Sequence, residues 1–158
     1  SHLRPIHLEP VDVATCVTTA IDAANLPSGL RVQTEDLDHL PMVMAGRQNL
    51  TLVFTNLLEN AADAMKGNGT ITIRGSLRGE RVQVAVGDTG PGIAPELHER
   101  IFEFNFSGRA SLRAGKLGFG LWWVKTLMAR LGGSVTVESD GSHGATFRLS
   151  LPRAEEVP

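Results

Sequence analysis

The chain has 158 residues, which is enough for one ordinary domain with a real core but too few for two. Its 15 Lys and Arg residues nearly balance its 17 Asp and Glu residues, so the charge indicates no non-specific attraction to nucleic acid or to membranes. The single cysteine, Cys16, excludes an internal disulfide and is expected to be a buried residue of a protein from a reducing compartment.

Residues 1–10 contain two prolines and are predicted to form an extended linker from an upstream region. Asp12 is the predicted N-cap of a helix that runs to about Asn25 and ends at a turn over residues 27–29. Residues 30–36 alternate as a strand does, and residues 40–46 fit a second, shorter strand.

The next predicted helix contains the stretch TNLLENAADAM, residues 55–65, with polar residues Asn56, Asn60 and Asp63 on one face. The apolar residues of this helix gather on another face: Leu50, Phe54, Leu57, Leu58, Ala61 and Met65. A solvated face usually consists of Glu, Lys and Arg, whereas Asn and Asp are poorer helix formers. From this pattern alone, a solvated face and a functional face are both open.

Residues 70–88 form the clearest predicted hairpin, which turns at Gly79 and ends at Asp88. The following GDTGPGIAPE segment places Gly90 and Gly92 after this aspartate, where a ligand could approach the backbone closely. An ordinary turn closed by the aspartate side chain is the alternative. A short helix is expected from Pro95 to Phe102, followed by an irregular stretch to residue 118.

The segment GKLGFGLWWVKTL leads into a predicted helix from about Gly120 to Leu131. Free N–H groups at a helix start can bind an anion, and nearby glycines let phosphate oxygens reach them. The alternative to an anion site is a flexible loop in which the glycines only allow the chain to bend. The segment matches neither a P-loop nor the dinucleotide-binding fingerprint. Residues 134–139 and 145–152 form the last predicted hairpin, and residues 153–158 a tail.

Strands that are neighbours in the sequence are expected to pair as hairpins. The prediction is therefore an α/β (α+β) two-layer sandwich, with a mixed, mainly antiparallel sheet and helices on one face. A single domain over residues 11–152 is expected. No signal peptide and no apolar run of membrane-spanning length is visible, so we expect a cytoplasmic domain, whatever the anchoring of its parent protein.

The order of these motifs over residues 10–152 resembles the ATP-binding catalytic domain of bacterial sensor histidine kinases. This domain has the Bergerat fold, which DNA gyrase, MutL and the heat-shock ATPase chaperones share. The resemblance implies ATP and Mg²⁺ as ligands. It implies nucleotide-binding roles for these residues: Asn56, Asn60, Asp63, Asp88, Gly90, Gly92, Ile93, Phe106, Gly118, Gly120, Leu121 and Thr146.

Within this set the resemblance assigns Asn60 to the metal and Asp88 to the adenine amino group. It implies that Thr146, together with Gly144, helps to hold the adenine. Phe102 and Phe106 match the phenylalanine motif at the base of a lid. Two basic residues are candidate phosphate contacts: Arg109 and Lys116.

The sequence departs from the family pattern at the lid. Residues 116–120 read Lys-Leu-Gly-Phe-Gly where many relatives read Gly-Thr-Gly-Leu-Gly, and one glycine is displaced to Gly115. Phe104 stands in place of the usual proline, and Asn105 in place of a phenylalanine. The pair Trp122-Trp123 is interpreted as core packing of the following helix.

The hydrolase relatives carry a glutamate general base four residues before the magnesium asparagine, and here that position is Asn56. Glu59 is adjacent to Asn60 but points away from it around the helix. A kinase is therefore favoured over a hydrolase.

His98 lies inside the domain and is not expected to be the phosphoacceptor. The implied partner is an upstream dimerisation and phosphoacceptor domain, with a response regulator acting indirectly, and no nucleic-acid or membrane contact is expected. A degenerate or regulatory nucleotide-binding module is an alternative. A serine-kinase anti-sigma factor of the same fold is another.

Overall fold

A computed structural model describes residues 4–104, 106 and 120–155 of the chain. Its elements follow one another in this order: β1 (Glu9–Val11), α1 (Val13–Ala23), β2 (Leu30–Glu35), β3 (Val43–Ala45), α2 (Arg47–Ala64), β4 (Gly69–Arg78), β5 (Arg81–Asp88), the 3₁₀ turns η1 (Pro95–Leu97) and η2 (Arg100–Phe102), α4 (Gly120–Arg130), β6 (Ser134–Glu138) and β7 (Ala145–Pro152).

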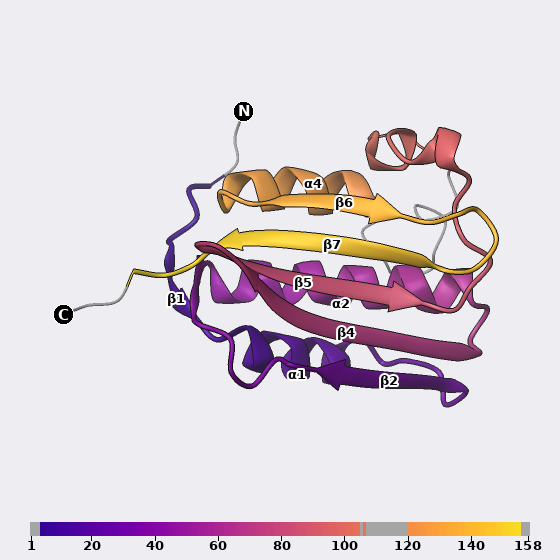
Figure 1. Ribbon diagram of the computed structural model, residues 1–158, viewed down its shortest axis with the longest axis horizontal. Coiled ribbons are helices and arrows are strands. Elements are labelled where there is room, and N and C mark those ends of the chain that lie inside the picture. Colours follow the sequence, from indigo (N-terminus) through magenta and orange to yellow (C-terminus); the bar gives the residue numbers. More distant parts are fainter. Residues whose placement is uncertain (1–3, 105, 107–119, 156–158) are drawn as a thin grey trace.

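Five strands form the main sheet in the order β2-β4-β5-β7-β6. The pairs β4–β5, β5–β7 and β6–β7 are antiparallel, whereas β2 runs parallel to β4. Helices α1, α2 and α4 lie together on one face of this sheet (Figure 1). The predicted two-layer α/β sandwich, with its mixed and mainly antiparallel sheet, is confirmed.

A separate two-stranded sheet lies near the start of the chain. Glu9 and Pro10, which were predicted to lie in the linker, form part of β1. The strand expected within residues 40–46 is β3, which pairs antiparallel with β1 and not with a strand of the main sheet. Three residues of each strand are enough because Val11 and Val43 are buried in the core.

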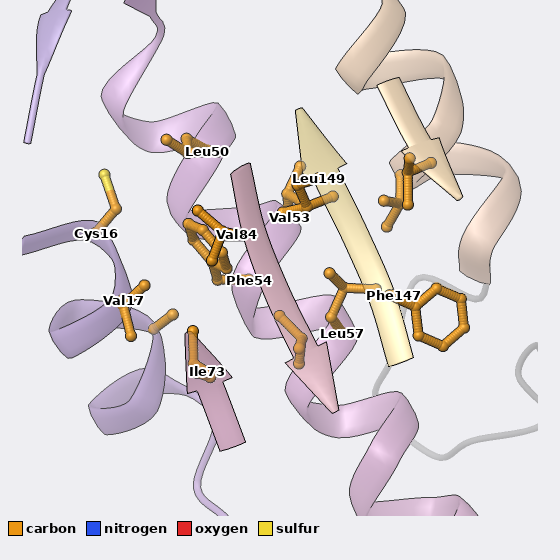
Figure 2. Close-up of a cluster of buried hydrophobic side chains, with 14 of the residues drawn as sticks. Cys16, Val17, Leu50, Val53, Phe54, Leu57, Ile73, Val84, Phe147 and Leu149 are labelled. Carbon is orange, nitrogen blue, oxygen red and sulfur yellow. The ribbon is translucent and has the colours of Figure 1, made fainter. Parts of the chain in front are cut away.

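Alternation along the strands directs one row of side chains toward the helices. Val84 of β5 and Leu149 of β7 point into the core, where Val84 lies by Phe54 and Leu149 by Val53, both of α2 (Figure 2). Cys16 of α1 belongs to the same buried cluster, as expected, and burial raises the pKa of its thiol. This core holds α2 and β5 together, and the ends of both elements reach the candidate site.

The segment from Pro95 to Phe102 differs from the expected short helix. It forms two 3₁₀ turns, η1 and η2, with Pro95 as the first residue of η1. Eight residues are too few to stabilise an isolated α-helix, and the tighter 3₁₀ geometry suits such short connections. Ile101 and Phe102 bury their side chains and anchor the segment to the core.

Candidate functional site

Asp88, a predicted site residue, lies at one end of the sheet, where β5 ends and β7 begins (Figure 1, right). The C-terminal part of α2 reaches the same end, since a Cβ atom at Gly90 would lie 3.2 Å from Cγ of Met65. The loop over residues 139–144 connects β6 to β7 beside it. Three segments that are far apart in the sequence therefore meet in one region: the end of α2, the end of β5, and the loop that leads into β7.

The polar face of α2 lies outside the apolar core. Asn56 and Asn60 are half-buried, and Asp63 is exposed. The neighbouring residues Leu57 and Leu58 are fully buried. The side-chain amides of Asn56 and Asn60 are thus partly shielded from water but not enclosed in the core, a setting in which their oxygen atoms can meet a ligand.

Asp88 is the last residue of β5, and its side chain is on the same face of the strand as the buried valines. Val84 and Val86 face the helices, and the strand period of two puts the Asp88 side chain on the same face. Its Oδ1 accepts a hydrogen bond from the N–H of Gly90 at 2.9 Å. Burial raises the pKa of this carboxyl group, while hydrogen bonds from the N–H groups of Gly90 and Ala145 oppose that rise.

The glycines after Asp88 pack against other backbone segments. The N–H of Gly144 donates to the carbonyl oxygen of Gly90 at 2.7 Å. Gly92 has a φ of +87°, and a Cβ atom there would lie 2.8 Å from the backbone nitrogen of Ser142. Gly92 is therefore required by the packing of two loops, a reason for glycine that is independent of any ligand.

Ile93 and His98 hold the loop that follows. Ile93 is half-buried and packs against the core. Nε2 of His98 lies 2.9 Å from the carbonyl oxygen of Ile93. A carbonyl oxygen only accepts, so in this hydrogen bond Nε2 carries the proton. His98 has a structural partner in the loop.

The side chain of Thr146, which the resemblance assigns to the adenine, lies on the face of the sheet away from the helices. In β7, Ala145 and Phe147 face the helices, and Thr146 between them faces the opposite side of the sheet. Thr146 pairs with Gly87, whereas Ala145 pairs with Asp88. A shift of one residue along a strand moves a side chain to the other face, so Ala145 takes the position beside Asp88.

Two aromatic pairs lie around the 3₁₀ turns. The ring of Phe102 is buried edge-to-face against Phe147, with centroids 6.2 Å apart. Phe104 is 55% exposed and meets Trp122 edge-to-face at 4.9 Å. The prediction of core packing therefore holds for Trp123, which packs on the core, whereas Trp122 pairs with Phe104 beside the site.

Helix α4 begins at Gly120, as predicted, with a φ of +57° at that residue. Leu121 packs against the core, and Phe106 is half-buried. The remaining predicted positions of the lid lie outside the described residues: Asn105, Arg109, Gly115, Lys116 and Gly118.

The donor chemistry of α2 fits a magnesium ion held mainly by phosphate oxygens. Mg²⁺ prefers oxygen ligands, keeps several waters, and is usually held by one or two protein groups plus substrate phosphates. The half-buried amide of Asn60 offers one such oxygen. Within residues 4–104, 106 and 120–155, no group of three or more His, Cys, Asp or Glu side chains forms a protein-only metal cage.

Two contributors to the site were missed by sequence reasoning, Ser139 and Met65. The Ser139 hydroxyl contacts Ile93 and Gly144, and Met65 accepts a hydrogen bond at Sδ from Thr89 at 3.5 Å. Met65 was assigned only to the apolar face of its helix. Nothing in the local pattern around Ser139 indicates its partner, because Ile93 is distant in the sequence.

Residues 45–155 match the family described as histidine kinase-, DNA gyrase B-, and HSP90-like ATPase. The chain is 37% identical over 169 residues to the sensory histidine kinase/phosphatase NtrB of Rhodobacter capsulatus, covering 97% of this chain and 46% of NtrB. It is 32% identical over 157 residues to the sensor histidine kinase ZraS of Escherichia coli K12, covering 95% of this chain and 32% of ZraS. The chain thus spans less than half the length of these relatives.

Solved structures agree with this similarity. Full-length ShkA in complex with AMPPNP superposes with a TM-score of 0.80 at 28% identity, over 100% of this chain and 33% of ShkA. The nucleotide-free catalytic domain of the histidine kinase ThkA gives a TM-score of 0.76 at 22% identity, over 94% of this chain and 97% of that domain. The ThkA likeness concerns the fold alone. In the part of the chain that the structure describes, no helix has the length and hydropathy needed to cross a bilayer.

Proposed function

Because the chain belongs to the histidine kinase-, DNA gyrase B-, and HSP90-like ATPase family, we propose that it binds Mg-ATP and donates the γ-phosphate to a histidine on a separate dimerisation domain. Its similarity to NtrB and ZraS, both named as histidine kinases, supports the kinase branch of the family. Phosphotransfer in two-component signalling is the activity that this branch implies.

The observation that carries the proposal is the position of Asp88. This half-buried carboxylate continues the apolar row of β5, and the half-buried Ile93 lies on the same loop. A purine needs an apolar surface for its ring and an acceptor for its exocyclic amino group. Asp88 provides the acceptor, and Ile93 provides part of the apolar surface.

The polar face of α2 supplies groups for the other end of the nucleotide. Asn56 and Asn60 are one helical turn apart on that face and are both half-buried. We assign the amide oxygen of Asn60 to magnesium and the amide of Asn56 to the phosphates. When bound, magnesium neutralises charge on the phosphates and helps to orient them. Asn60 then fixes where this charge lies relative to Asp88.

The residue at position 56 favours transfer over hydrolysis. A hydrolase needs a general base that takes a proton from water, and the amide of Asn56 cannot do so. His98 is hydrogen-bonded to Ile93 through Nε2 and is not offered as an acceptor. We therefore place the acceptor histidine in another domain of the parent protein. A response regulator would then receive the phosphate from that histidine.

Calorimetric titration with Mg-ATP tests the binding half of the proposal. Saturable binding is expected, and no heat at millimolar nucleotide would overturn it. The transfer half is tested by mixing the chain with radiolabelled ATP and the purified dimerisation domain of its parent protein. Acid-labile label on that domain is expected. Acid-stable label on a serine would favour the anti-sigma kinase, and binding without any transfer would favour a regulatory module.

A further inference from the structure

We propose that Ser139 is a positioning residue that sets the geometry of the adenine end of the site, an inference that rests on the proposed function. Its Oγ accepts hydrogen bonds from the N–H of Ile93 at 2.9 Å and of Gly141 at 3.2 Å. It donates its own proton to the carbonyl oxygen of Gly144 at 2.6 Å. A serine hydroxyl has one proton to donate and two lone pairs that accept, so these three bonds occupy its whole hydrogen-bonding capacity.

The partners of Ser139 lead directly to Asp88. Gly144, whose carbonyl oxygen accepts from Ser139, donates its N–H to the carbonyl oxygen of Gly90 at 2.7 Å. Gly90 in turn donates its N–H to Oδ1 of Asp88 at 2.9 Å. Three hydrogen bonds, connected through the backbone of Gly144 and of Gly90, therefore join the Ser139 hydroxyl to the carboxylate that is proposed to meet the adenine amino group.

The same hydroxyl also fixes the apolar side of the site. It holds the backbone of Ile93, whose side chain packs on the core. The loops are close at this point, because a Cβ atom at Gly92 would lie 2.9 Å from Ser139 Oγ. Ser139 thus sets the distance between the purine-facing loop and the loop before β7, and with it the alignment of Ile93 with Asp88.

Loss of this hydroxyl would leave the Ile93 N–H and the Gly144 carbonyl without their shared partner in a half-buried place. Unpaired polar groups of this kind are costly, so we expect the loop to shift until water reaches them. The shift would misalign the adenine end and leave the phosphate end, on α2, in place. Recognition of the base should weaken more than recognition of the phosphates.

The test compares ATP with ITP, in which a carbonyl replaces the adenine amino group, by calorimetric titration with magnesium. The wild-type chain should prefer ATP. Ser139→Ala should bind ATP about ten-fold more weakly and should lose most of the preference for ATP over ITP. Ser142→Ala is the matched control, because Ser142 is an exposed serine of the same loop, and it should keep the wild-type preference.

The ratio of the two affinities separates positioning from simple destabilisation. Partial unfolding lowers the affinity for ATP and for ITP by the same factor and leaves their ratio unchanged. An unchanged ratio in folded Ser139→Ala would overturn the inference while the proposed function stands. No ATP binding by the wild-type chain would overturn both.

If Ser139→Ala does not fold, Ser139→Thr and Ser139→Val provide the comparison. They have nearly the same shape and differ in the hydroxyl group. Thr should keep a higher ATP preference than Val, and equal preferences in the two variants would overturn the inference.

Discussion

The N–H of Gly144 donates to the carbonyl oxygen of Gly90 at 2.7 Å and joins the start of β7 to the loop that follows β5. Gly144 is buried and has a φ of +73°. A Cβ atom there would overlap the backbone carbonyl of Asp88. The approach of these two segments, and hence the position of Asp88, depends on the absence of a side chain at this residue.

Gly144→Ala should therefore destabilise the protein by about 3 kcal/mol or more, from left-handed backbone strain plus a clash with backbone that cannot move aside cheaply. Urea unfolding would measure the loss. Gly79→Ala is the matched control, since Gly79 has a φ of +60° but nothing within 4 Å of its ideal Cβ position. It should lose only about 1 kcal/mol. Equal losses in the two variants would show that the clash is not important.

Asp88→Asn should weaken ATP binding. The amide presents N–H donors where the carboxylate offers only acceptors, so either the purine amino group or the new amide is left without a partner. A loss of ~1 to 3 kcal/mol is expected, which is roughly 5- to 150-fold in affinity. Titration with Mg-ATP measures it. Asp22→Asn, on the exposed side of α1, is the charge-matched control, and an unchanged affinity in Asp88→Asn would remove Asp88 from the site.

The raised pKa of Asp88 predicts a pH effect on stability without nucleotide. Because burial raises this pKa above its ordinary value of 3.8, the folded chain binds more protons than the unfolded chain between the two values. The Asp88 contribution to stability therefore falls as pH rises through that window, and the penalty is complete above it. Asp88→Asn cannot titrate. The unfolding free energy of Asp88→Asn, measured relative to wild type in urea titrations, should rise between about pH 3.5 and about pH 7. A difference that does not change with pH would contradict this.

Asn60→Ala tests the proposed metal contact. We expect Mg-ATP affinity to fall about ten-fold, the result of losing one polar contact of ~1.4 kcal/mol. Binding of ADP without metal should fall much less. Titrations with and without magnesium measure both, and Gln48→Ala, an exposed amide on the same helix, is the control. Equal losses for the two ligands would indicate a damaged helix or a different role.

The chain alone should turn over ATP very slowly and form no stable phosphohistidine. Phosphoryl transfer depends mainly on an acceptor placed in line with the γ-phosphate, and His98 is held by Ile93 through Nε2. Radiolabelled ATP, followed by an acid-lability test and mapping of any label, checks this. Label on His98, or rapid phosphate release abolished by Glu59→Gln, would contradict it.

Local periodicity was enough to predict on which face of its helix or strand each of several candidate residues lies. The helical spacing of Asn56 and Asn60 placed both on one face of α2, and alternation along β5 placed Asp88 at the end of a buried row. Each of these inferences needs only neighbouring residues, because the period of a helix or strand determines which side chains share a face. The hairpins were predictable for the same reason, since their turns are short and local.

Tertiary structure decided the rest, because it depends on pairs of residues that are far apart in the sequence. The strands β2 and β4 pair in parallel, so no short turn in the sequence indicates that they are neighbours. The pairing of β1 with β3 accompanies the burial of Val11 and Val43 in the core. Thr146 falls on the outer face because the strand register, and not the motif, sets its direction. The three hydrogen bonds of Ser139 exist only once two distant loops have met, so no pattern along the chain could reveal them.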